Sequence, residues 1–117
     1  MQSKIKNELG TVVIDNEVIA RVAGITAMEC YGVVGMAAKN VRDGLVQLLK
    51  MESLTKGVRL GLAGEDLTID LHIIVEYGTN INAIADTLIG NVKYKVEENI
   101  GLKVREINVF VEGVRTE

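Results

Sequence analysis

Hydrophobic and polar residues follow two different periods along the chain, and these periods predict where strands and helices lie. In residues 57–78, GVRLGLAGEDLTIDLHIIVEYG, apolar residues alternate with polar or small ones on both sides of Gly64-Glu65. Alternation of period two is typical of half-buried strands, and a leading glycine suits a two-residue type II′ turn. We therefore predict a β-hairpin here. The turn fixes its register as Val58 with Leu71, Arg59 with Asp70 and Leu60 with Ile69.

Helical spacing appears before and after this hairpin. Residues 16–29 follow Asp15, whose carboxylate can cap a first helical turn. Their buried stripe is predicted as Val18, Val22, Ile25 and Met28, with Ala20, Gly24 and Ala27 forming a second row of small side chains that allows close approach of another element.

Two further helices are predicted from the same spacing. A shorter helix covers about residues 41–56 and ends before Gly57. A long helix starts after Thr79 or Asn80 and runs to about residue 99, with Gly101 just past its end, where glycine is favoured. The buried stripe of the long helix is predicted as Ile81, Ile84, Ala85, Leu88, Val92 and Val96.

The elements add up to one α+β domain over residues 1–117. Adding the strand-like runs GTVVID at 10–15 and REINVFVEGV at 105–114 gives the order β-α-α-β-β-α-β. We expect a small, mainly antiparallel sheet with helices on one face, partly like a KH domain. Because the last strand alternates, Phe110 should point away from the helices, as should Ile74 in the hairpin.

Charge and cysteine content narrow the function classes. The net charge is -3 at pH 7, and no run of basic residues offsets it, so nucleic acid is not a favoured partner. A single cysteine cannot form an internal disulfide, which suits a reducing compartment. The start MQSKIKNELG has no apolar signal-peptide core, and no apolar run is long enough to span a bilayer. We expect a cytoplasmic protein without direct membrane insertion.

Residues with catalytic chemistry are few. His72 is the one histidine and shares a strand face with Asp70, but a metal or catalytic site needs a third group, so a solvated sheet face is the favoured interpretation. Cys30 has no neighbouring base or cationic cluster to activate it, and a buried structural thiol is favoured. Phosphate-binding and nucleophile motifs are absent from the sequence. We expect no enzymatic activity, no cofactor and no metal.

The segment Gly32-Val33-Val34-Gly35 has two interpretations. Helix, G-x-x-G, helix is the arrangement with which KH modules clamp a nucleotide backbone, and Lys39 and Arg42 would supply positive charge. Two central valines favour burial or extended geometry instead. We favour an extended bend whose glycines relieve backbone strain, and keep the clamp as the alternative.

A resemblance covers nearly the whole chain. IDNEVIARVAG leading to GVVGM, the junction VEYGTNI and the ending GLKVREINVFVEGV occur in the order typical of the alkaline shock protein family of Gram-positive bacteria, also called the envelope stress response family. The chain resembles its short housekeeping form, because it lacks long charged or glutamine-rich ends. The family supplies no catalytic motif to carry over.

The resemblance implies a non-enzymatic cytoplasmic protein that supports cell-envelope homeostasis. It also implies a homo-oligomer with protein partners, either a membrane-anchored member of the family, which would bring the chain near the membrane, or a fatty acid kinase system. Our leading hypothesis is a self-associating scaffold or adaptor that uses sheet edges and the outer face around Ile74 and Phe110. The alternative is a KH-like RNA-binding module using Gly32, Gly35, Lys39 and Arg42.

Overall fold

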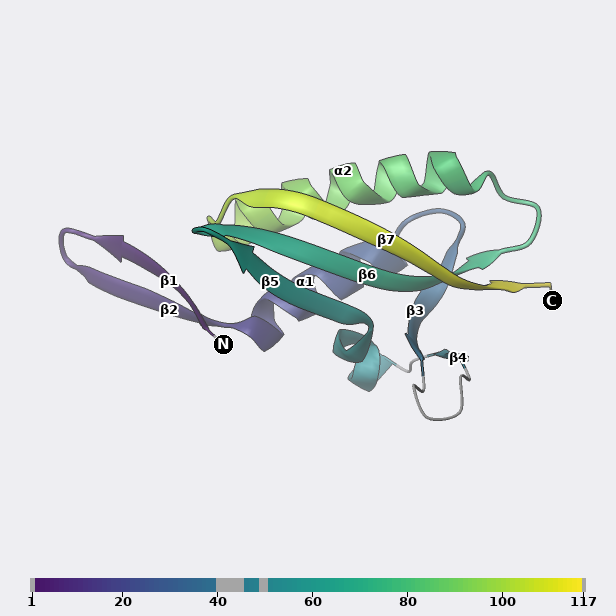
Figure 1. Cartoon of the computed structure of the whole chain (residues 1–117), viewed down its shortest axis with the longest axis horizontal. Coiled ribbons are helices and arrows are strands. Elements are labelled where there is room, and N and C mark those ends of the chain that lie inside the picture. The colour runs from purple at the N-terminus through teal and green to yellow at the C-terminus, as the bar shows by residue number, and fades with distance from the viewer. Residues whose placement is uncertain (1, 40–45, 49–50, 117) are drawn as a thin grey trace.

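The computed structural model of the chain describes residues 2–39, 46–48 and 51–116, and its helices lie on one face of a sheet (Figure 1). The α+β class and the helices on one face agree with the prediction. In chain order the elements are β1 (Gln2–Asn7), β2 (Gly10–Asp15), α1 (Asn16–Met28), β3 (Val33–Lys39), β4 (Val46–Leu48), the 3₁₀ helix η1 (Met51–Gly57), β5 (Val58–Ala63), β6 (Asp66–Glu76), α2 (Ile81–Ile100) and β7 (Val104–Arg115).

Strand β6 is the centre of the five-stranded sheet. Along one edge it pairs antiparallel first with β5, through residues 66–71, and then with β3, through residues 73–75. Along its other edge it pairs with β7, and this pair is parallel. Strand β4 extends the sheet beyond β3. Strands β1 and β2 form a separate antiparallel ribbon, which projects beyond the sheet in Figure 1.

The predicted β5–β6 hairpin is confirmed with its register. Val58 pairs with Leu71, and the pairing continues to Ala63 and Asp66 around the two-residue turn. Gly64 has a φ of 68°, and no non-glycine residue that the structure describes has a positive φ. Glu65 therefore has a negative φ, which fits type II′ and excludes type I′.

The predicted helix ends are also confirmed. The Asp15 carboxylate accepts a hydrogen bond of 3.0 Å from the backbone N–H of Glu17 at the start of α1. The Asn80 side chain accepts one of 3.1 Å from Ala83 at the start of α2. Gly101 ends α2 in the left-handed conformation, with a φ of 82°. Local sequence alone specifies these three positions.

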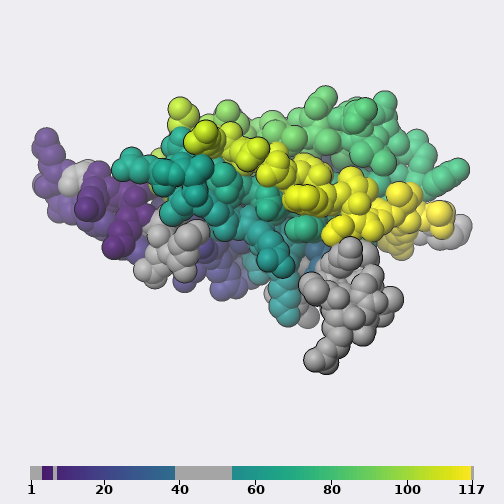
Figure 2. Space-filling model, in the orientation of Figure 1, coloured from purple at the N-terminus to yellow at the C-terminus, as the bar shows by residue number. Residues whose placement is uncertain are grey.

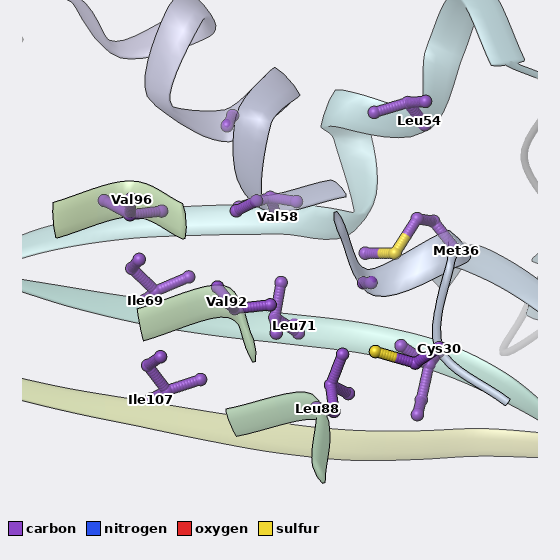
Figure 3. Close-up of a cluster of buried hydrophobic side chains, with 14 of the residues drawn as sticks. Cys30, Met36, Leu54, Val58, Ile69, Leu71, Leu88, Val92, Val96 and Ile107 are labelled. Atoms are coloured by element: carbon purple, nitrogen blue, oxygen red, sulfur yellow. The ribbon is translucent and has the colours of Figure 1, made fainter. Parts of the chain in front are cut away.

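The core lies between the sheet and the two helices. Side chains of β6 and β7 that point to the helices meet side chains of α2 that point to the sheet (Figure 3). Four of the six residues predicted for the α2 stripe are buried, whereas Ile81 is exposed and Ala85 is partly buried. The buried α2 residues are Ile84, Leu88, Val92 and Val96.

The predicted helix over residues 41–56 is wrong in the part that the structure describes. Residues 46–48 form β4, which pairs with residues 37–39 of β3, and η1 follows. Pairing with β3 satisfies backbone groups that a helix would have satisfied internally, so tertiary contact overrides the apolar spacing. Residues 40–45 and 49–50 lie outside the described part.

The predicted face of α1 is wrong as well. Its buried side is the small-residue row, together with Ile19 and Ala23. The predicted stripe is largely uncovered, since Val18 is 50% exposed and Ile25 is 39% exposed. Small side chains let α1 approach η1 closely: a Cβ on Gly24 would stand 2.5 Å from Leu54 Cδ1.

Candidate interaction surface

The outer face of the sheet is the side of β5, β6 and β7 that turns away from both helices. Figure 2 shows this side, with side chains of β6 and β7 across its centre. Along β6 the even-numbered residues from 66 to 74 are partly buried, while the odd-numbered ones from 67 to 75 are fully buried under the helices. This alternation turns His72 and Ile74 to the outer face, as the sequence predicted.

Cross-strand pairing organises the centre of this face. His72 stands opposite Phe110, and their rings stack with centroids 4.8 Å apart and planes 13° from parallel. One residue pair earlier, the side-chain amide of Asn108 donates a 3.0 Å hydrogen bond to the Asp70 carboxylate. The parallel β6–β7 register therefore builds a small ordered cluster from residues far apart in the chain.

A bulge in β7 adds a carboxylate to the cluster. The register shifts between Ile73 and Ile74, so Glu112 is the extra residue between the partners of these two positions. Its Oε2 lies 3.2 Å from His72 Nδ1, and both side chains are mostly covered. Bulges commonly re-aim a side chain in this way. The His72–Glu112 contact holds the imidazole in place beneath Phe110.

Ile74 and Phe110 flank His72 on the same face. Phe110 is 44% exposed, and Ile74, which is partly buried, stands opposite Gly113. Because Gly113 has no side chain, the flank of Ile74 toward β7 stays open. The result is an apolar surface around one ordered histidine, suited to contact with another molecule.

The chemistry of this face is limited to contact and hydrogen bonding. A histidine and one carboxylate make up the pair, and the residues that the structure describes hold no group of three or more His, Cys, Asp or Glu that could bind a metal ion. Cys30 is buried, with 7% exposure, and its Sγ lies 3.5 Å from the Thr26 carbonyl and 3.6 Å from the Asn91 amide. It has the environment of a structural thiol, as predicted.

The arrangement required for a nucleotide clamp at Gly32 to Gly35 is not formed, which corrects the KH-like alternative. Gly32 is a turn residue with a φ of 88°, and strand β3, not a helix, follows it. The backbone groups are already engaged, since the Gly32 carbonyl accepts from Glu76 and the Val33 N–H donates to Cys30. Gly35 pairs with Ile74 inside the sheet.

The two cations assigned to that clamp cannot be placed at a site. Lys39 is the last residue of β3, and Arg42 lies outside the described residues. The favoured interpretation, an extended bend, is close to the observed geometry, although the sequence did not reveal that the segment begins a strand.

A second apolar surface was missed by the sequence reasoning. Val18, Val22 and Ile25 of α1 border a groove of about 410 Å³, with Asp15, Glu17 and Arg21 at its rim. The adjoining β1–β2 ribbon exposes Val12 and Val13. The available signal was that α1 carries two apolar rows, of which its own sheet can cover only one.

Fold and surface together define a small α+β binding module. The sequence model of the alkaline shock protein 23 family, described by a cell envelope-related function, matches residues 4–116. The chain belongs to this family, which confirms the resemblance, and its general role is connected with the cell envelope.

Relatives agree with this assignment. The Bacillus subtilis protein YloU is 46% identical over 116 residues, covering 98% of this chain and 97% of that one. The Streptococcus pyogenes protein Spy1614 is 32% identical, covering 98% and 96%. A Streptococcus pyogenes protein named as a homologue of the stress response regulator gls24 is 28% identical, covering 92% of this chain and 60% of its own length. None of these names states an enzymatic activity.

Membrane insertion was judged from the two described α-helices. Neither α1 nor α2 is both long and apolar enough to cross a bilayer.

Proposed function

We propose that the protein is a non-enzymatic cytoplasmic scaffold or adaptor that supports cell-envelope homeostasis and the stress response through self-association and protein partners. Family membership and the stress-regulator name of one relative support the biological setting. The observation that carries the molecular part is the ordered apolar surface on the outer sheet face, centred on His72 and Phe110.

This surface has the composition of a contact site. Aromatic residues that are exposed and already held in one rotamer lose little conformational freedom on binding, so they contribute strongly to interfaces. Phe110 meets both conditions, because its ring stacks on His72 while 44% of the residue remains exposed. Ile74 extends the apolar area, and Asp70 and Asn108 give it a polar margin.

The partners fall in two groups under this proposal. One is a membrane-anchored member of the same family, which would hold the chain at the membrane without a span of its own. The other is a fatty acid kinase system. In both cases the outer sheet face makes the contact with the partner, and the chain supplies no catalytic group.

The test is the substitution Phe110→Asp, followed by crosslinking in cells and recovery of the tagged protein. A carboxylate in place of the ring should remove the stacked contact and disfavour burial of the surface, so recovery of crosslinked envelope partners should fall by about tenfold or more. Circular dichroism and the thermal midpoint of the purified variant establish that the fold persists.

Tyr94→Asp is the matched control. Tyr94 is an exposed aromatic residue on α2, away from the outer sheet face, so the same change in chemistry should leave partner recovery unaltered. Undiminished recovery with a folded Phe110→Asp chain would show that the proposed surface is wrong.

A further inference from the structure

The groove on α1 and the β1–β2 ribbon form one continuous surface. Alternation along β2 places Val13 and Asp15 on the same face of the ribbon, and the cross-strand partner of Val13 is Lys4. Asp15 also borders the α1 groove, next to Val18. The ribbon face with Val13 and the exposed stripe of α1 therefore meet at Asp15 and look to the same side of the molecule.

Both halves of this surface are unusual for a chain that stays alone. A two-stranded ribbon is at best marginally stable in water without a further layer against it. Its other face turns Ile14 toward the core, but Val12 and Val13 remain about half exposed. On α1, Val18, Val22 and Ile25 recur with spacings of four and three, which is the pattern of a helix stripe covered by a partner.

The two halves match each other in length and in charge. Strand β2 has six residues and spans about 20 Å, and α1 has 13 residues and also spans about 20 Å. The ribbon face carries Lys4 and Lys6, which are cross-strand partners of Val13 and Thr11. The α1 side carries more acid than base; its exposed charged residues are Asp15, Glu17, Arg21 and Glu29.

We propose that two copies of the chain pair reciprocally, with the β1–β2 ribbon of each lying along the exposed stripe of α1 in the other. A two-fold axis near the junction of Asp15 and Asn16 brings each ribbon over the other copy's helix, because the two segments run from that junction in opposite directions (Figure 1). Such an interface uses the same patch twice and closes at two copies. It covers Val13, Val18, Val22 and Ile25 together.

This inference deepens the proposed self-association and rests on it. It assigns self-association to the ribbon and α1, which leaves the outer sheet face free for other partners. The two proposals can therefore fail separately: a chain that stays single yet loses partners on Phe110→Asp overturns only the reciprocal pair.

The first measurement is the mass of the full chain by light scattering over a micromolar concentration series. We expect twice the chain mass of 12.7 kDa for the wild type. Val18→Lys places a charge in the stripe facing Lys4 and Lys6 of the other copy, and should raise the dissociation constant of the pair by about tenfold or more. Val114→Lys is the matched control, because Val114 has 49% exposure against 50% for Val18 and lies at the far end of β7.

The second measurement tests the arrangement by disulfide crosslinking. Val13 lies about 7 Å from Asp15 along the strand, close to the level of Val18 on the other side of the proposed axis. Differently tagged Val13→Cys and Val18→Cys chains, mixed and oxidised, should form a heterodimeric disulfide, whereas Val13→Cys with Val114→Cys should not. A single-chain mass for the wild type, a pair unaffected by Val18→Lys, or equal crosslinking in both mixtures would each overturn the proposal.

Discussion

Gly32 shows how a single residue can fix the path of the chain between α1 and the sheet. Its φ of 88° lies in the left-handed region, and a Cβ at this position would stand 2.4 Å from Ile84 Cδ1. The turn thus requires glycine for both its backbone and its space. The glycine that suggested a nucleotide clamp in the sequence has a structural reason to be there.

Gly32→Ala should therefore destabilise the fold. The strained backbone and the contact with Ile84 together should lower the free energy of unfolding by about 2–4 kcal/mol, measured by urea denaturation. Gly90→Ala is the control with the opposite sign. A Cβ on Gly90 meets nothing within 4 Å in the middle of α2, so alanine should raise stability by about 0.5–1 kcal/mol. Equal stabilities of the Gly32→Ala and wild-type chains would contradict this account of the turn.

Contact residues were predicted in position but not in organisation. Alternation alone turned Ile74 and Phe110 to the outer face. The stacking of Phe110 on His72, and the approach of Glu112 to the imidazole, depend on the parallel β6–β7 register and on a bulge. These features join residues 38 to 40 positions apart, so no local pattern could reveal them.

At the scale of elements, α2 is the clearest case of a helix defined by its own sequence. Its cap residue, its C-terminal glycine and most of its buried stripe follow from spacing and from the chemistry of Asn80 and Gly101. Helices with such local signals should respond locally when one of the signals is removed.

Asn80→Ala should lower the free energy of unfolding by about 1 kcal/mol, because the first turn of α2 loses the acceptor for the Ala83 N–H. Asn82→Ala makes the same chemical change two residues further on, at an exposed position within the first turn. It should be neutral or slightly stabilising, since alanine is the better helix former. Thermal or urea unfolding of both variants decides the point, and equal losses at the two positions would count against the cap.

The elements that the sequence did not predict share a physical cause. The β5–β6 hairpin was predictable because a short turn sets its register. In contrast, β3 and β4 exist through pairing with β6 and with each other, and their apolar spacing fits a helix equally well. The buried face of α1 was likewise chosen by fit against Leu54, which favours small residues over the larger valines.

At the scale of the whole molecule, the chain is elongated, with extents of 53 × 31 × 24 Å. Its outer sheet face and its ribbon-helix surface are separate in space and different in character. One is centred on an ordered aromatic ring, and the other combines a valine stripe with opposite charges. A scaffold needs such a separation, because it must bind a second copy and another partner at the same time.

The central claim is that the protein works through protein contacts in the setting of the cell envelope. The most direct measurement is crosslinking in cells, recovery of the tagged chain from membrane and soluble fractions, and a parallel nuclease-treated sample. We predict recovery of the chain itself and of envelope or lipid-metabolism proteins, unaffected by nuclease. Recovery of RNA, or of ribosomal proteins that disappear after nuclease treatment, would contradict the account.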